Sequence, residues 1–381
     1  MSFSGSLIQN AIYIAGQPPE WPLAAEEWER AAEELLEPGP FGYIAGGAGS
    51  ESTMSANLDA FARWRLRPRM LTGNGMRDIS VEVLGMRSPA PFFLAPIGVL
   101  SIAHEAGEIG VAQAAASSHV PMVLSSASTH SLEEIAETNA PRWFQLYWVN
   151  DREICASFVQ RAEAAGYGAI VVTLDTLNLG WRPRDLRHAY LPFLQGQGCG
   201  QFFSDPVFRS RLEKSPDEDL LTAAATMLAT FPNLGLEWSD LDWLRGQTAL
   251  PILVKGVLTE EDAREALAHG VDGIIVSNHG GRQVDGAVAA LDALVEVRDA
   301  LPDAVVLMDG GIRCAADVLK AMALGADAVL LGRPYAYALA VGGARGVAEL
   351  IQNLMAEVDL SLALAGGHSI RDLDRSWLTR V

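Results

Sequence analysis

The sequence has few cysteines, a deficit of basic residues and no long apolar run. Three cysteines occur among 381 residues and none forms a CxxC pair, which argues against a disulfide framework and a zinc site. Lys and Arg number 28 against 47 Asp and Glu, a net charge of −19, so the chain should repel nucleic acid and anionic lipid. No run reaches the ~18 apolar residues of a membrane span, and MSFSGSLIQNAIYIAG lacks a basic signal-peptide start. We therefore expect a cytoplasmic protein with no nucleic-acid or membrane partner.

From about residue 90, short apolar runs alternate with alanine-rich stretches of helical period. The runs are PFFLAP (91–96), VPMVLSS (120–126), RWFQLYW (142–148), AIVVTLD (169–175), LPILVKG (250–256), GIIVSNHG (273–280), AVVLMDGG (304–311) and AVLLGRP (328–334). Continuously apolar strands are typical of parallel sheets that are buried on both faces. Several intervening stretches, such as TEEDAREALAHG, end in glycine as helices often do. Eight strand–helix units predict a (β/α)8 TIM barrel, with a doubly wound sheet as the alternative.

Two regions interrupt this alternation. Residues 1–85 precede the first strand and contain an amphipathic pattern near Ala24–Leu36, which predicts an N-terminal helical segment capping a barrel of residues 86–381 in one domain. Residues 176–248 separate the fourth and fifth strands, and connections this long often act as lids. This lid-like insertion contains aromatic residues that are able to close a site, namely Tyr190, Phe193, Phe202 and Phe203. The alternative is that these aromatics pack the insertion onto the barrel.

Polar residues and glycines occupy the carboxyl end of nearly every predicted strand, where barrel active sites lie. Those that we single out are Ala95, Ser125, Gln145, Tyr147, Thr173, Asp175, Lys255, Ser277, His279, Arg282, Asp309, Gly311, Arg313, Gly332 and Arg333. The last two strand ends, DGGIR and LGRP, combine exposed backbone N–H groups with arginine, as phosphate sites do. No GxGxxG follows the first strand, which argues against a Rossmann fold. A mononucleotide fits this pattern, and FMN fits best, with Lys255 as the cation beside the reduced ring.

The stretch SNHGGRQ (277–283) resembles the active-site signature of the FMN-dependent α-hydroxy-acid oxidase and dehydrogenase family. The resemblance extends from about Trp28 to Asp372. Within the family, FGYIAGGAGSEST, QLYW, TLDT, LGWRPRDL and DPVF look most like the lactate 2-monooxygenase members.

The resemblance implies a role for each matching residue. His279 matches the catalytic base, and Asp175 matches the acid that orients it. Arg282 and Arg182 match the pair that grips the substrate carboxylate, although Arg184 lies only two residues further on. Tyr43 and Tyr147 match tyrosines that bond the substrate, Tyr147 acting at its hydroxyl. The implied FMN contacts are Ala95, Ser125, Gln145, Thr173, Lys255, Ser277, Asp309, Gly311, Arg313, Gly332 and Arg333.

Two positions depart from the family pattern. Trp181 stands where many relatives have a second basic residue, and Ala315 replaces the glycine that is usual after DGGIR-x. The resemblance also implies a homotetramer or homo-octamer.

The expected reaction is oxidation of a small L-2-hydroxy acid, L-lactate, by O₂. In the monooxygenase version, bound pyruvate is decarboxylated to acetate, CO₂ and water. One alternative is an oxidase that releases pyruvate and H₂O₂, and a second is a quinone-linked dehydrogenase. From a different class, the chain could be a catalytically silent barrel that binds a phosphorylated ligand.

Overall fold

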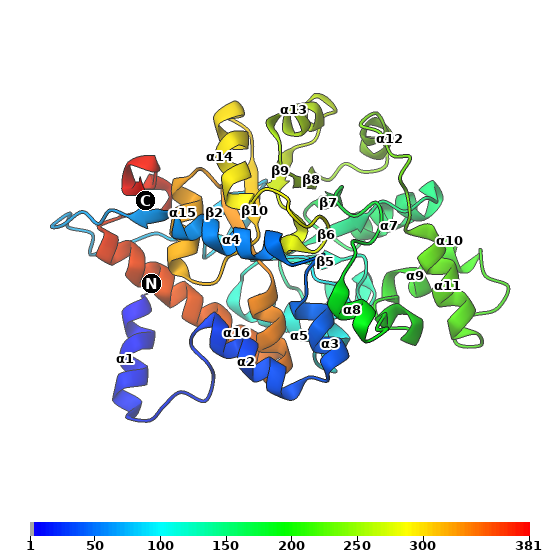
Figure 1. The fold of residues 1–381 in the computed structure, drawn as a ribbon, viewed down its shortest axis with the longest axis horizontal. Helices are drawn as coiled ribbons and strands as arrows, with labels where there is room; N and C mark the ends of the chain where they lie inside the picture. Colours follow the sequence, from blue (N-terminus) through cyan, green and yellow to red (C-terminus); the bar gives the residue numbers. More distant parts are fainter. Residues whose placement is uncertain (1–3) are drawn as a thin grey trace.

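The fold is a closed barrel of eight parallel strands surrounded by helices, seen in a computed structural model that describes residues 4–381 (Figure 1). The barrel strands are β4 (Phe92–Leu94), β5 (Met122–Ser125), β6 (Arg142–Tyr147), β7 (Ile170–Thr173), β8 (Ile252–Val257), β9 (Gly273–Val276), β10 (Val306–Asp309) and β11 (Ala328–Leu331). They pair in chain order, and β11 pairs with β4 to close the barrel. The prediction of a TIM barrel is confirmed.

The strands form here because their side chains are apolar on both faces. Every residue of β4, β5, β7, β9, β10 and β11 is buried, as expected for strands between a packed interior and an outer ring of helices. The helices after the barrel strands include α5 (Gly107–Ser118), α6 (Leu132–Glu137), α7 (Arg152–Ala164), α13 (Glu260–Ala268), α14 (Ala290–Ala300), α15 (Ala315–Ala323) and α16 (Arg333–Ala365). Gly270 follows α13 with φ 74°, the left-handed geometry that ends many helices. In residues 4–381 no helix has the length and hydropathy needed to cross a bilayer.

The N-terminal part of the described chain contains four helices and three short strands. The helices are α1 (Gly5–Ala15), α2 (Ala25–Leu35), α3 (Pro38–Ala45) and α4 (Ser52–Ala62), and the strands are β1 (Trp64–Leu66), β2 (Val81–Val83) and β3 (Met86–Ser88). The helix expected near residues 24–36 is present as α2, which packs against α16 as α1 also does (Figure 1). β1 pairs with the C-terminal strand β12 (Leu378–Arg380). The β2–β3 hairpin lies against Gly168, just before β7, at the end of the barrel opposite the site.

The insertion between β7 and β8 is largely helical. It contains α8 (Pro183–Arg187), η2 (Pro192–Gln195), α9 (Gly200–Ser204), α10 (Pro206–Arg209), α11 (Leu220–Thr230) and α12 (Asp240–Arg245). In Figure 1 it projects from one side of the barrel.

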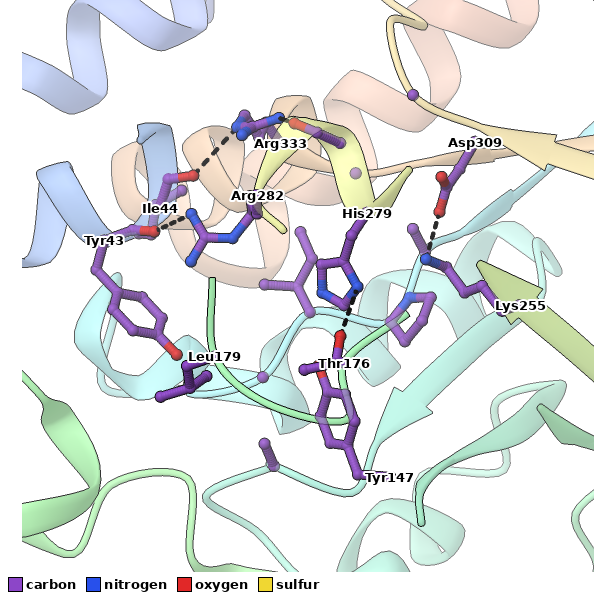
Figure 2. Close-up of a pocket in the computed structure, with 18 of the residues that line it drawn as sticks. Tyr43, Ile44, Tyr147, Thr176, Leu179, Lys255, His279, Arg282, Asp309 and Arg333 are labelled. Carbon is purple, nitrogen blue, oxygen red and sulfur yellow. Dashed lines mark hydrogen bonds and ion pairs between the residues drawn. The ribbon is translucent and has the colours of Figure 1, made fainter. Parts of the chain in front are cut away.

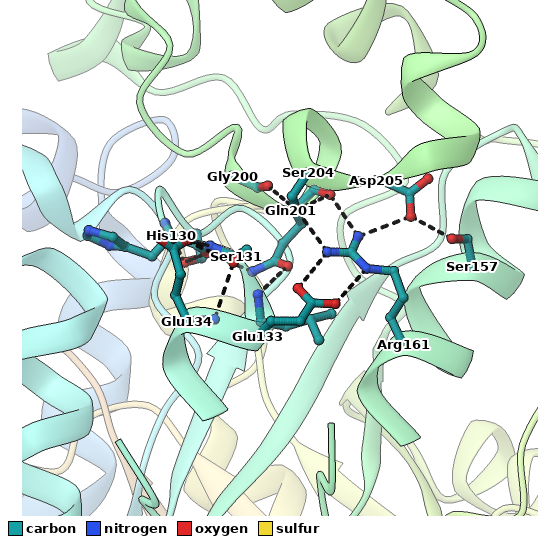
Figure 3. A network of polar contacts seen from close by, with 12 residues as sticks. His130, Ser131, Glu133, Glu134, Ser157, Arg161, Gly200, Gln201, Ser204 and Asp205 are labelled. Carbon is teal, nitrogen blue, oxygen red and sulfur yellow. Dashed lines mark hydrogen bonds and ion pairs between the residues drawn. The ribbon is translucent and has the colours of Figure 1, made fainter. Parts of the chain in front are cut away.

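The α9–α10 part of the insertion is tied to the barrel through Arg161 of α7. Its guanidinium donates to both carboxylate oxygens of Glu133 (2.9 and 2.7 Å), to Asp205 Oδ2 (3.0 Å) and to Ser204 Oγ (2.8 Å) (Figure 3). Asp205 is fully buried, so this cation balances a charge that is out of water. The α9–α10 part of the insertion is therefore an anchored structure.

Two of the four insertion aromatics face this anchor rather than a cavity. The Phe202 ring lies 4.9 Å from Phe158 of α7 and 5.3 Å from Phe208, and Phe203 stacks on Phe208 at 6.3 Å, all between ring centroids. For Phe202 and Phe203 the structure favours the alternative, in which they pack the insertion onto the barrel. Phe202 also lies 5.7 Å from Phe231, between ring centroids, and so supports the cavity wall from behind. Phe193 does line the cavity described below.

Candidate active site

A cavity of about 1390 Å³, its open mouth included, lies at the carboxyl ends of the barrel strands. Figure 2 shows Tyr43, Arg282 and His279 around one part of it, with Lys255 and Asp309 on the other side of His279. Ligand sites in TIM barrels occupy this end because the βα loops are free to vary there. Of the residues singled out from the sequence, those that line the cavity are Tyr43, Ala95, Tyr147, Arg182, Phe193, Lys255, His279, Arg282, Asp309, Gly311, Arg313, Gly332 and Arg333.

His279 is held through one ring nitrogen. Its Nδ1 lies 2.8 Å from Asp175 Oδ1 and 3.1 Å from Thr176 Oγ1. Thr176 Oγ1 also donates to Asp175 Oδ1 at 2.9 Å. Burial lowers the pKa of His279 below its usual 6.5 and outweighs the opposing effect of Asp175. The imidazole is therefore neutral at pH 7, which leaves Nε2 as a proton acceptor.

Asp175 remains ionised although it is buried. Burial alone would raise its pKa, but the His279 imidazole, the Lys255 cation and the Thr176 hydroxyl together hold that pKa below the usual value. A buried carboxylate beside an imidazole stabilises the protonated ring once the ring has taken a proton.

Two arginines converge on the cavity beside His279. Arg282 Nη1 donates to the backbone carbonyls of Tyr43 (2.6 Å) and Gly46 (2.8 Å). Arg182 donates from Nε to the carbonyl of Arg282 (3.1 Å) and from Nη2 to Gln283 Oε1 (2.8 Å). Burial, with Arg182 and Arg333 nearby, lowers the pKa of Arg282 to about 9. The nearby Asp185 carboxyl, whose pKa burial raises, is influenced by both arginines. In residues 4–381 neither guanidinium lies within ion-pair distance of a carboxylate, so the pair suits a substrate carboxylate.

Arg184, the neighbouring alternative to Arg182, is directed elsewhere. It pairs with Glu51 at 2.6 Å outside the cavity lining. The structure therefore brings Arg182, and not Arg184, to the cavity.

Two tyrosines complete this part of the cavity. The Tyr147 ring stacks on His279 with 6.5 Å between ring centroids, and the Arg282 guanidinium lies over the Tyr43 ring at 5.2 Å. Burial, then Tyr43 and Asp175, raise the pKa of Tyr147 well above its usual value. Its hydroxyl is thus protonated at neutral pH and can donate a hydrogen bond.

Buried polar side chains link the strand ends behind the cavity. Ser125 Oγ donates to Gln145 Oε1, and Gln145 Nε2 donates to Thr173 Oγ1, both at 3.0 Å. Lys255 Nζ lies 2.9 Å from Ser277 Oγ and 3.0 Å from Asp309 Oδ2. Burial would lower the pKa of Lys255, but Asp309 and Asp175 raise it, so this lysine is a cation.

The last two strand ends form a cradle of backbone and arginine. Gly311 has φ +87°, and a Cβ there would meet the Asn57 carbonyl oxygen at 2.7 Å. At Gly332 a Cβ would meet only Ala95, at 4.0 Å, so this glycine borders open space. Arg313 lines the cavity and donates to the carbonyl of Ile312. Such a cradle suits a phosphate.

FMN fits this set of groups. Asp309 Oδ1 is a buried acceptor with no hydrogen-bond partner in residues 4–381, and a hydroxyl of the ribityl chain is the donor that it lacks. Lys255 would supply a cation for a ring that becomes anionic on reduction, and the glycine and arginine cradle would hold the phosphate. Within residues 4–381, no group of three or more His, Cys, Asp or Glu side chains is placed to hold a metal ion.

Comparison with known proteins shows the family to which this chain belongs. The model of the family "FMN-dependent dehydrogenase" matches residues 32–380. The chain belongs to the FMN-dependent dehydrogenase family. It is 44% identical to the FMN-dependent alpha-hydroxy acid dehydrogenase qulF of Penicillium citrinum, over 93% of this chain and 89% of that protein. It is 41% identical to the L-lactate oxidase of Lysinibacillus sphaericus, over 94% and 93%. A crystal structure of mandelate oxidase superposes with a TM-score of 0.84 at 38% identity, over 94% and 98%.

Membership of this family confirms FMN as the cofactor and makes the chain an α-hydroxy-acid oxidoreductase. The two departures from the family pattern do not enter the cavity. Trp181 is 74% exposed and contributes its backbone carbonyl to Gly49 N at 2.9 Å. Ala315 is buried, and its N–H donates to Glu357.

In this member of the FMN-dependent dehydrogenase family, sequence reasoning assigned no role to several residues that shape the site. Thr176 shares Nδ1 of His279 with Asp175, and Gln283 holds Arg182. Asn57 and Asn278 form a mutual pair of side-chain hydrogen bonds, 2.9 and 2.8 Å long, that ties α4 to the His279 loop. Thr176 is the last residue of TLDT, and Asn278 and Gln283 lie in SNHGGRQ, so their place in these motifs was the signal that could have found them.

The outer wall of the cavity is apolar and comes mainly from the insertion. It consists of Leu179, Phe193, Leu228, Phe231 and Pro232. Phe231 lies between Tyr147 and Phe193, at 5.8 and 6.0 Å between ring centroids. The aromatic wall is therefore continuous with the side chain that stacks on His279.

Proposed function

We propose that this enzyme oxidises L-lactate with O₂ and decarboxylates the retained pyruvate, giving acetate, CO₂ and water. The observation that carries the proposal is the His279–Asp175 pair beside two arginines in a single cavity that fits FMN. A 2-hydroxy acid needs a carboxylate clamp and a base at its α-carbon and hydroxyl group, and these residues provide both.

Each residue has one task in the proposed reaction. Arg182 and Arg282 bind the carboxylate, with the Tyr43 ring against the Arg282 guanidinium. The Tyr147 hydroxyl donates to the substrate. His279 Nε2 accepts a proton from the substrate, and Asp175 stabilises the imidazolium that results. FMN, when bound, supplies the acceptor for the two electrons that leave the α-carbon.

The apolar outer wall supports the decarboxylating outcome. Phe193, Leu228 and Phe231 line the cavity that also contains the two arginines, and an apolar wall that excludes water strengthens the hold of two arginines on a carboxylate. If pyruvate stays bound until O₂ is reduced, the H₂O₂ formed beside it decarboxylates it. The products depend on whether pyruvate is released before or after O₂ is reduced, and therefore on the relative rates of these two steps.

The second candidate is an oxidase that releases pyruvate and H₂O₂. It is favoured by the likeness to an L-lactate oxidase at 41% identity. Both candidates share the same first half of the reaction, so the residue assignments above apply to each.

Product analysis separates the two candidates. The FMN-loaded enzyme is given L-lactate in air, and acetate, pyruvate and H₂O₂ are measured per O₂ consumed. The proposal predicts one acetate per O₂ with little free H₂O₂. One pyruvate and one H₂O₂ per O₂ would assign the oxidase reaction instead.

A further inference from the structure

The peptide group between Gly46 and Gly47 connects the two ends of the cavity. Its carbonyl oxygen accepts from Arg282 Nη1 at 2.8 Å and from Arg333 Nη2 at 3.0 Å. One backbone acceptor therefore serves both Arg282 of the carboxylate clamp and Arg333, which the resemblance places among the FMN contacts. The Arg333 guanidinium also donates to the carbonyls of Ile44 (3.2 Å) and Gly280 (3.0 Å). The N–H of the same peptide donates to Glu51 Oε1 at 3.0 Å.

Glu51 is itself fixed from the insertion side. Its Oε2 accepts from Arg184 Nη2 at 2.6 Å. Arg184 lies in α8, and the residue that precedes this helix is Arg182. Burial would raise the pKa of Glu51, but Arg184 and the Gly47 N–H hold it below the usual value, so the side chain is a carboxylate. Its backbone is left-handed, with φ +63°, a conformation that non-glycine residues keep only where surrounding contacts enforce it.

The orientation of this peptide decides what the two arginines meet. With the observed orientation a carbonyl dipole points at two guanidinium groups, whereas a flipped peptide would point an N–H at them. Glycine on both sides makes such a flip sterically easy. The Glu51 carboxylate opposes the flip by holding the N–H end.

We propose that Glu51 is a positioning residue that fixes the Gly46–Gly47 peptide and through it aligns Arg282 for the substrate carboxylate and Arg333 for the FMN phosphate. The proposal rests on the roles given above to these two arginines. It assigns Glu51 no contact with substrate or cofactor, since Glu51 does not line the cavity.

The charge of Glu51 and its hold on the Gly46–Gly47 peptide predict opposite changes in anion affinity when Glu51 is lost. Removing a negative charge near Arg333 and Arg282 should by itself tighten the binding of anions. Loss of the acceptor that orients the peptide should weaken that binding. The sign of the change in Glu51→Ala therefore separates the two effects.

A pair of double variants isolates the hydrogen bond at constant charge. Glu51→Gln with Arg184→Met and Glu51→Ala with Arg184→Met both remove one negative and one positive charge. Only the first keeps an acceptor for the Gly47 N–H. FMN affinity is measured by quenching of flavin fluorescence on titration into apoprotein, and pyruvate affinity by perturbation of the bound flavin spectrum.

The Gln–Met variant should bind FMN and pyruvate within about twofold of wild type, and the Ala–Met variant about tenfold more weakly, the usual size for one lost buried hydrogen bond. Equal affinities in the two variants, or tighter binding in Glu51→Ala, would overturn the proposal. If the Ala–Met chain does not fold, Glu51→Gln against Glu51→Ala gives the same comparison.

Asp285→Asn is the matched control for a loosened loop. Asp285 holds the same turn from outside, through Ser50 and Ser52, without touching the 46–47 peptide. It should leave both affinities within twofold, and weakening equal to that of Glu51→Ala would show that any loosening of the turn suffices. If wild-type enzyme binds FMN but not pyruvate, the proposed function fails. The FMN affinities of the Glu51 variants would still test whether Glu51 positions the Gly46–Gly47 peptide.

Discussion

Asp175 and His279 lie on loops after different strands, yet Asp175 Oδ1 and His279 Nδ1 are 2.8 Å apart. This contact fixes which imidazole nitrogen faces the protein and leaves Nε2 for a substrate. His279 keeps a left-handed backbone, with φ 57°, so the loop SNHGG presents the ring at some conformational cost. Strain of this kind is typical of residues whose position serves function.

Replacing Asp175 with Asn should slow substrate oxidation with little change in FMN content. The amide keeps the size of the side chain but provides no charge to stabilise the imidazolium. We expect the rate constant for anaerobic flavin reduction by L-lactate to fall by about 10²–10⁴-fold. Stopped-flow absorbance measures it, and a rate near that of wild type would contradict the assignment of Asp175.

The pH dependence of the same rate should reflect the lowered pKa of His279. The base acts in its neutral form, which predominates above its pKa. Because burial holds that pKa below 6.5, the acid limb of the reduction rate should have its midpoint below pH 6.5. On the alkaline side the rate should hold until Arg282, whose pKa is lowered to about 9, begins to lose its charge. Asp175→Asn should shift the acid limb to still lower pH, since Asp175 raises the pKa of His279. A midpoint of the acid limb above pH 7 would be incompatible with an imidazole that is neutral before substrate oxidation.

Arg182 and Arg184 offer a direct test of the carboxylate clamp. Arg182→Met removes a cavity guanidinium, whereas Arg184→Met removes one that pairs with Glu51 outside it. Pyruvate binding to the oxidised enzyme should weaken by about 100-fold in the first variant, the upper range for loss of one partner of a charged hydrogen bond. Arg184→Met should weaken it by about tenfold or less. The reverse order would reassign the clamp to Arg184.

The aromatic wall should control how long pyruvate stays. Phe231→Ala opens the wall between Tyr147 and Phe193, so the share of lactate that ends as pyruvate and H₂O₂ should rise severalfold over wild type. Phe203→Ala is the matched control, because its ring packs on Phe208 away from the cavity. Product ratios that change equally in the two variants would show that the aromatic wall does not control the release of pyruvate.

The barrel was predictable because its strands are continuously apolar and their polar ends fall in register. Asp175, Lys255, His279 and Asp309 could be placed at the site from strand ends alone. The resemblance implied the Tyr43 side chain, but the backbone contribution of the N-terminal segment was not predictable. Tyr43, Ile44 and Gly46 meet Arg282 and Arg333 through backbone carbonyls. Any residue type offers a backbone carbonyl, so no sequence pattern marks it.

The insertion shows a second limit. Phe193 and Phe202 stand nine residues apart in a segment of short helices, where no single period tells which side chains face the cavity. Phe193 lines it and Phe202 fills the seam against α7. Only the tertiary anchor through Arg161 and Asp205 decides this division.

The most direct test of the central claim is anaerobic titration of the FMN-loaded enzyme with L-lactate, with the flavin absorbance followed in wild type and in His279→Ala. The account predicts complete bleaching of the wild-type flavin by L-lactate, and a yellow His279→Ala protein that retains FMN but is reduced at least 100-fold more slowly, in line with loss of a general base. A wild-type flavin that stays oxidised, or a His279→Ala variant that bleaches at the wild-type rate, would contradict it.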